Sequence, residues 1–131
     1  MKKTVFELES IIGRESTLTF KVYATRPSMV KACTRVDKAY KKVSPKSFSG
    51  MCAAYTPPPD TGKERALVDI YLNDQDKRLE VLVHEVQHAV TRLYNWMYPR
   101  QFWTTNEIFV EETANFVGML SSYFWEEWQN E

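Results

Sequence analysis

The chain has 131 residues, of which 44% are hydrophobic, so it can bury a core as a single domain over residues 1–131. Its 17 acidic and 17 basic residues cancel to a formal net charge of zero, which argues against nucleic acid as a partner. No apolar run is long enough to cross a bilayer, so we expect no membrane-spanning segment.

The N-terminal segment MKKTVFELES does not have a leader pattern, because Glu7 and Glu9 stand where a signal peptide needs an unbroken apolar stretch. We therefore expect a cytoplasmic protein. Cys33 and Cys52 lack CxxC spacing, and a cytoplasmic chain of this size needs no disulfide. Both cysteines are expected to be reduced and mostly buried.

The first half of the chain predicts mixed structure. Residues 17–23 (TLTFKVY) and 66–72 (ALVDIYL) alternate apolar and polar side chains, as half-buried strands do. Residues 50–56 (GMCAAYT) form a third expected strand, and apolar residues at helical spacing predict a helix over about 28–42. The triple proline within residues 56–64 predicts a loop.

The second half predicts two long helices. Asn73 or Asp74 can cap a first helix that runs to about residue 95, and Thr104 and Glu107 have the spacing of a capping box that opens a second, over about 105–127. The apolar stripe of the first helix, which must face a core, comprises Leu79, Leu82, Val83, Val86, Val90 and Leu93. The expected fold is α+β, with a small, mainly antiparallel sheet and one N-terminal helix before these two helices.

The two histidines of the chain, His84 and His88, lie in the sequence HEVQH within the first long helix, roughly opposite its apolar stripe. Residues four apart stack on one helix face, so the two imidazoles can bind one zinc ion. Glu85 lies about 100° around the helix, where its carboxylate can act as general base toward a zinc-activated water. The alternative is a chance match, because HExxH fixes only three residues.

A catalytic zinc ion needs a third protein ligand, and with both histidines used this must be a carboxylate or, less readily, a cysteine. Suitable carboxylates lie in the next helix, within TNEIFVEETANFVGML (105–120). Glu107 and Glu111 share one face of that helix with the small residues Ala114 and Gly118, which allow a close approach to the helix that carries the histidines.

HEVQH followed by EETAN at residues 111–115 resembles the gluzincin metallopeptidases, in which a glutamate of a following helix completes HExxH. Within that clan the chain is most similar to the minimal metallopeptidase-like proteins encoded by bacteriophages, whose second helix reads approximately E-x-x-A-Y-L-V-G. Glu111, Ala114, Val117 and Gly118 match this pattern. The resemblance covers about residues 66–120.

The resemblance implies a minimal zincin-like domain that holds one zinc ion through His84, His88 and Glu111, with Glu85 as general base. It also implies that residues 66–72 are the edge strand against which an extended peptide substrate pairs. A phage-encoded protein would act in the host cytoplasm.

Two positions bear on the ligand assignment. Asn115 stands where cellular gluzincins often have an aspartate that accepts a hydrogen bond from a ligand histidine. Glu107 follows an asparagine, as in the N-E pair of larger gluzincins, and is therefore the alternative third ligand or a residue that supports the ligands. The residues that could stabilise an oxyanion are Arg92, Tyr94, Tyr98 and Tyr123.

Three classes of function follow from these patterns. The leading hypothesis is a zinc-dependent hydrolase, a peptidase that acts on a peptide or protein substrate. The alternative is a zincin scaffold that keeps its zinc ion and acts as a protein-interaction module, for example a phage protein that binds a host factor. The third class is a metal-free helical structural protein.

Overall fold

The computed structural model describes residues 1–10, 13–36, 48–57, 65–98 and 106–130. Within these ranges the chain forms four strands and three α-helices. They are β1 (Lys2–Glu9), β2 (Glu15–Tyr23), α1 (Arg26–Val36), β3 (Met51–Tyr55), β4 (Ala66–Asn73), α2 (Leu79–Met97) and α3 (Asn106–Gln129), with a short 3-10 turn, η2 (Asp74–Asp76), between β4 and α2.

The strands form one mixed sheet in the order β1-β2-β4-β3. β1 pairs with β2 and β3 pairs with β4 in antiparallel fashion, whereas β2 and β4 run parallel. The internal strand β4 is bonded on both sides, and its Val68, Ile70 and Leu72 are fully buried. β1 and β3 are therefore the two edges of the sheet.

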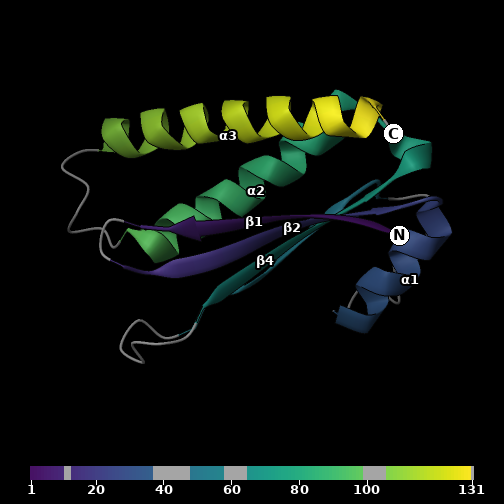
Figure 1. Cartoon of the computed structure of the whole chain (residues 1–131), viewed down its shortest axis with the longest axis horizontal. Coiled ribbons are helices and arrows are strands. Elements are labelled where there is room, and N and C mark those ends of the chain that lie inside the picture. The colour runs from purple at the N-terminus through teal and green to yellow at the C-terminus, as the bar shows by residue number, and fades with distance from the viewer. Residues whose placement is uncertain (11–12, 37–47, 58–64, 99–105, 131) are drawn as a thin grey trace.

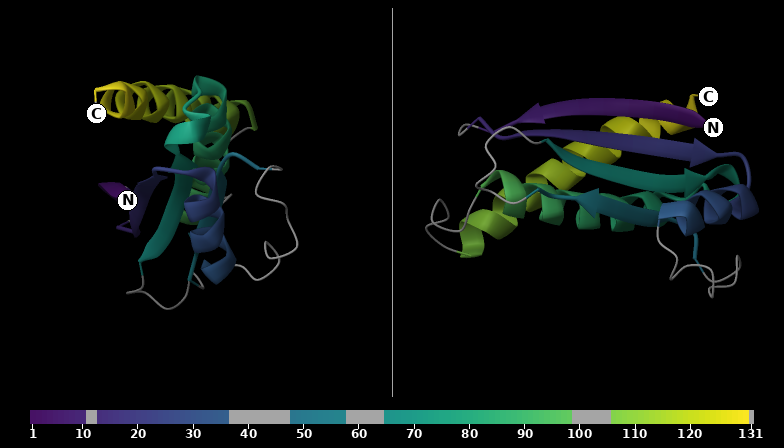
Figure 2. Two further views of the ribbon diagram at one scale, coloured as in Figure 1. Left: turned by 90° about the vertical axis from the view of Figure 1, so that its right-hand side faces the viewer. Right: turned by 90° about the horizontal axis from the view of Figure 1, so that it is seen from below.

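Helices cover both faces of this sheet (Figures 1 and 2). α2 and α3 pack on the face that carries Leu18 and Phe20, and the Phe20 ring stacks on Phe124 of α3 with 4.0 Å between centroids. On the opposite face α1 buries Met29 and Cys33 against Tyr71 and Met51. The two apolar clusters share β4, which ties the layers together.

The apolar stripe of α2 faces the core as the sequence predicts. Leu82, Val86, Val90 and Leu93 are fully buried, whereas Leu79, the first residue of the helix, is 48% exposed. The stripe thereby determines which side of α2 turns toward the sheet and which side remains accessible.

Several predicted elements differ from those observed. Strand β1 was not among the predicted elements, and the sheet is mixed rather than mainly antiparallel because β2 and β4 are parallel. The 66–72 strand is internal, so its assignment as the edge strand is wrong, and β3 takes that place. The described part of α1 ends at Val36. The predicted continuation to residue 42 lies outside the described residues.

The start of α2 also lies later than predicted. Asn73 does act as a cap, but for η2, because its side chain accepts a hydrogen bond from the Asp76 amide at 3.0 Å. α2 then begins at Leu79 after a turn at Lys77. The last helix agrees with its prediction to within two residues at its C-terminal end, Gln129.

Two further expectations are confirmed. Cys33 is buried and Cys52 partly buried, both are free thiols, and burial raises the pKa of each to about 12. None of the helices in the described ranges is long and apolar enough to span a bilayer.

Asp76 joins the end of η2 to the start of α1. Its buried carboxylate accepts hydrogen bonds from Arg26 Nε at 2.6 Å and from Asn73 Nδ2 at 3.1 Å. The Arg26 guanidinium in particular holds the pKa of Asp76 below its ordinary value. A carboxyl group with a depressed pKa stabilises the fold fully above its unfolded-state pKa and loses that contribution as the pH falls through the folded-state value.

We expect Asp76→Ala to lower the free energy of unfolding at pH 7 by about 2 kcal/mol, because the hydrogen bonds that Arg26 and Asn73 donate to a buried charge are lost. The difference from wild type should shrink as the pH falls below about 4, the ordinary range of an aspartate. Urea unfolding across pH measures both effects. Glu80→Ala is the control, since Glu80 is exposed and its pair with Arg78 should contribute within a few tenths of a kcal/mol.

Candidate metal site and cleft

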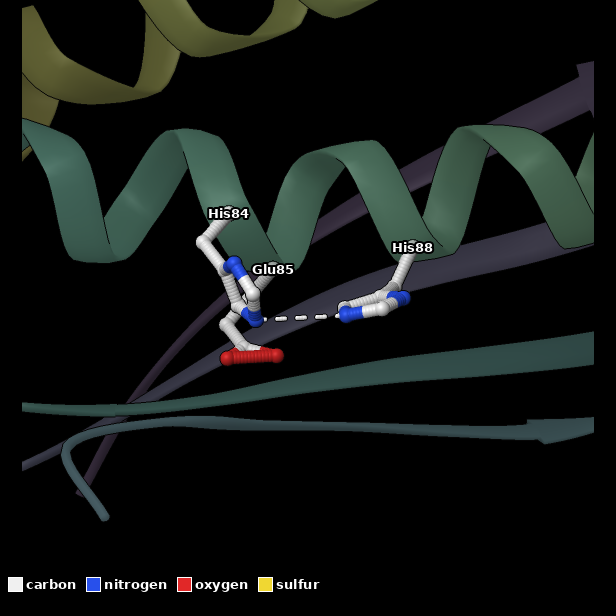
Figure 3. A group of neighbouring side chains, drawn as sticks. All are labelled: His84, Glu85 and His88. Carbon is white, nitrogen blue, oxygen red and sulfur yellow. Dashed lines mark hydrogen bonds between the residues drawn. The ribbon is translucent and has the colours of Figure 1, made fainter.

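One turn of α2 carries the histidine pair on its accessible side (Figure 3). His84 and His88 are both exposed, and their rings lie nearly perpendicular, at 83°, with 4.7 Å between centroids. The two Nε2 atoms are 3.2 Å apart. Residues i and i+4 of a helix present their side chains in this way without any help from the rest of the fold.

The separation of these nitrogens fits a metal ion. Two nitrogens bound to tetrahedral zinc at about 2.0–2.1 Å are about 3.3 Å apart, close to the observed spacing. The Glu85 carboxylate belongs to the same group, since ligand atoms of His84, Glu85 and His88 all lie within 4.8 Å of one another. Among the described residues, these are the three neighbouring His, Cys, Asp or Glu side chains that could hold a metal ion together.

Glu85 differs from its two neighbours in burial. Its side chain is only 6% exposed, and burial raises the pKa of its carboxyl group, an effect that the nearby His84 partly opposes. No described residue donates a hydrogen bond to this carboxylate. The side chain lines a cleft, so the carboxylate of a mostly buried residue remains open to a ligand there, as at many functional sites.

Gly50, just before β3, makes room for Glu85. A Cβ atom at Gly50 would lie 3.0 Å from Glu85 Cγ and 3.2 Å from the backbone oxygen of Tyr71. Any larger residue would therefore press on both the carboxylate-bearing side chain and the neighbouring strand β4. Sequence reasoning placed Gly50 at the start of a strand and missed this contact, because it joins segments far apart in the chain.

A cleft of about 370 Å³ opens beside the group. His84 and Glu85 form one wall, and the other residues that line it are Phe48, Ser49, Gly50, Arg78, Glu80 and Val81. The charges at this end are balanced, since Arg78 pairs with Glu80 at 3.2 Å and donates to Ser49 Oγ at 3.2 Å.

The cleft is the first of two hollows along α2 and the edge strand β3, which together are called the α2–β3 groove. A second hollow of about 300 Å³ lies toward the other end of both elements, lined by Ala54, Thr56, Arg92, Asn95 and Trp96. Among the described strands β3 bonds to β4 alone, so it is an edge of the sheet. His84 lines the first hollow, and Arg92, about two turns further along α2, lines the second.

The structure does not bring the expected third ligand to the histidines. Glu111 is exposed on α3 and is not part of the group that His84, Glu85 and His88 form. In Figure 3 these three side chains leave α2 on the side away from α3. Glu107 lies in α3, but its side chain is outside the described part, so its role stays a prediction.

Asn115 is exposed on α3, and the described residues place no hydrogen bond between it and either imidazole. The four possible oxyanion stabilisers are scattered. Tyr94 packs on Tyr98 and on Phe116 of α3, and Tyr123 donates to Glu127 at 3.2 Å. Arg92 alone among them is a lining residue of the groove.

No protein family model, no curated protein and no solved structure matches this chain. What the group of side chains does is therefore inferred from its geometry and chemistry.

We expect Gly50→Ala to lower the free energy of unfolding by about 1–3 kcal/mol, because the added methyl group overpacks the site against Glu85 and a strand backbone. Gly118→Ala is the matched control. A Cβ at Gly118 meets nothing within 4 Å, and replacing a helical glycine by alanine should stabilise α3 by up to about 1 kcal/mol. Denaturant unfolding of the two variants would contradict the assigned contact if both substitutions stabilised the protein.

We also expect Glu85→Gln to stabilise the metal-free protein at pH 7, by about 1 kcal/mol, because a buried unpaired charge is removed at nearly constant volume. The raised pKa sets the sign of the pH dependence. Wild type gains stability relative to the variant as the pH falls through the folded-state pKa of Glu85, since protonation then removes the same charge. Thermal unfolding with a chelator present, at a series of pH values, measures the difference.

Proposed function

We propose that the protein is a zinc-dependent hydrolase that cleaves a peptide or similar amide bond. His84 and His88 hold the metal ion, and Glu85 is the general base. The observation that carries this proposal is the convergence of the two Nε2 atoms at 3.2 Å beside a buried carboxylate in a cleft.

Zinc bound there would supply Lewis acidity, which polarises a carbonyl oxygen and acidifies water. Glu85 is placed to accept the proton of a water molecule in the cleft and to return it to the leaving amine. Its raised pKa suits this exchange, because a base poised nearer neutrality both takes up and releases a proton. The absence of a side chain at Gly50 leaves room for the Glu85 side chain beside the start of β3.

The groove supports a peptide as the substrate. An extended chain can add to an edge strand through main-chain hydrogen bonds, and β3 offers that edge along the histidine turn. The side chains of β3 that face α2, Cys52 and Ala54, are small, which leaves space over this part of the strand. This is the role that the resemblance implied for residues 66–72, transferred to the strand that occupies the edge.

A catalytic zinc site takes three protein ligands and one open position. The resemblance to gluzincins implies a carboxylate of α3 as the third ligand, Glu111 first and Glu107 second. Because the imidazoles leave α2 on the side away from α3, either ligand requires α3 to approach from another position than the one observed. Zinc titration of Glu111→Ala and Glu107→Ala decides between them, since loss of the true ligand should weaken binding far more than loss of the other.

A specific observation favours a second function. With Glu111 apart from the histidines, Glu85 is the carboxylate that completes the described group, and a glutamate that ligates zinc cannot also serve as base. The protein would then be a zinc-binding scaffold that acts through a protein partner.

One substitution separates the two functions. We expect Glu85→Gln to retain stoichiometric zinc but to lower peptide hydrolysis by about 10²–10⁴-fold, the usual contribution of general base catalysis. His84→Ala and His88→Ala should each lose zinc as well. Mass spectrometry under native conditions reports the metal, and an internally quenched peptide library reports turnover.

Glu80→Gln is the matched control, because it neutralises another carboxylate that lines the same cleft but is exposed. It should leave both zinc content and turnover close to those of wild type. Loss of zinc from Glu85→Gln would make Glu85 a ligand and favour the scaffold, whereas full turnover by Glu85→Gln would contradict the proposed mechanism.

A further inference from the structure

The two ends of the α2–β3 groove differ in charge. At the end beside His84, Arg78 has Glu80 at 3.2 Å and Asp76 at 3.9 Å as ionic partners. At the other end, Arg92 is exposed and lines the hollow between α2 and β3, and no carboxylate of the described residues forms an ion pair with it. The groove thus presents a single uncompensated cation among the described residues that line its two hollows.

The walls around Arg92 are fixed by contacts that do not involve its own guanidinium. Trp96 Nε1 donates to the Pro57 carbonyl oxygen at 3.0 Å, which joins the chain after β3 to the last turns of α2. Arg14 lies over the Trp96 ring, 5.8 Å from its centroid, and donates to the Trp96 carbonyl oxygen. These contacts fix the position of the indole, which lines the hollow. Asn95 adds a polar amide to the same hollow.

Arg92 also has a fixed relation to the metal site. His84, His88 and Arg92 follow one another at four-residue spacing, so they share one face of α2. Arg92 lies one turn beyond His88, about 6 Å along the helix axis. An extended peptide covers that distance in about two residues.

We propose that this hollow, with Arg92 as its cation, is a subsite that selects an acidic side chain of the peptide substrate. The inference rests on the proposed function and adds a substrate class to it. Arginine suits the task because its planar guanidinium can donate two parallel hydrogen bonds to one carboxylate. Trp96 and the small Ala54 shape the space, and Asn95 and Thr56 offer further polar groups.

The strand geometry gives the selected residue a position. β3 runs in the same direction as α2, since Gly50 before its start lies by Glu85 and Ala54 near its end lies by Arg92 and Trp96. A peptide that pairs antiparallel to β3, the more stable arrangement, has its N-terminal part beside Arg92. The acidic side chain then lies about two residues before the bond that is cleaved.

The test uses eight-residue, alanine-rich peptides that carry a single Glu, Gln or Lys at each position in turn. With zinc-loaded wild type, Glu two residues before the cleaved bond should raise kcat/KM over Gln by roughly tenfold, the size of one charge-assisted hydrogen bond. Arg92→Gln should abolish that preference, and Arg92→Glu should shift it toward Lys. Arg35→Gln, which removes an exposed arginine on α1, should leave the preference unchanged.

A binding measurement separates the subsite from the chemistry. Fluorescence anisotropy with zinc-loaded Glu85→Gln protein and labelled peptides should show the same Arg92-dependent preference without turnover. Preference in binding with no cleavage by wild type would uphold the subsite and overturn the hydrolase. Equal Glu-to-Gln ratios in wild type and Arg92→Gln would overturn the subsite, and a uniform loss of kcat on all peptides would make Arg92 an oxyanion stabiliser instead.

Discussion

The rotation of α2 about its own axis is the constraint on which the site depends. Leu82, Val86, Ala89, Val90 and Leu93 are all fully buried against the sheet and α3. Each such aliphatic side chain contributes about 1.5–3 kcal/mol on burial, so together they rival the 5–15 kcal/mol net stability of an ordinary domain. Turning the helix by one residue would expose part of this stripe and drive a histidine into the core. The apolar packing therefore holds the imidazoles on the groove side of the helix, although none of the packed residues touches them.

The same packing buries most of Glu85, which disfavours the charged form of its carboxyl group. Glu85, next to His84, falls at the border between the buried stripe and the accessible face, and this burial of most of the residue raises the pKa of its carboxyl group. The strand beside it is adapted to this side chain, because Gly50 has no side chain where Glu85 needs space. A sequence selected for stability alone would have a neutral residue at position 85. Stability given up at one position, together with a glycine that accommodates it, is the pattern expected of a functional site.

The features that could be predicted from the sequence are those set by local spacing. The strands β2 and β4 and the two long helices follow from alternation and from helical periodicity, and the meeting of His84 with His88 follows from i,i+4 geometry alone. β1 was missed because Val5 faces outward while Thr4 faces inward, which blurs its alternation. The identity of the edge strand could not be predicted, since pairing of β4 with β2 joins residues about fifty positions apart along the chain. For the same reason neither the contact of Gly50 with Glu85 nor the side of α2 that α3 occupies can be deduced from periodicity.

The side of α2 from which Glu85 projects bears on whether it is a base or a ligand. Residues 84 and 88 point in nearly the same direction, whereas residue 85 is rotated by about 100°, toward the sheet. Figure 3 shows its carboxylate between the imidazoles and the strands, and Gly50 meets its Cγ there. The ligand atom of Glu85 still lies within 4.8 Å of those of both histidines, so the zinc content of Glu85→Gln decides between a base and a ligand. A carboxylate kept beside the ion by packing, and not directed at it by the helix, is better suited to receive a proton than to share a coordination shell. The position of Glu85 thus depends on contacts of the apolar framework as much as on the histidines.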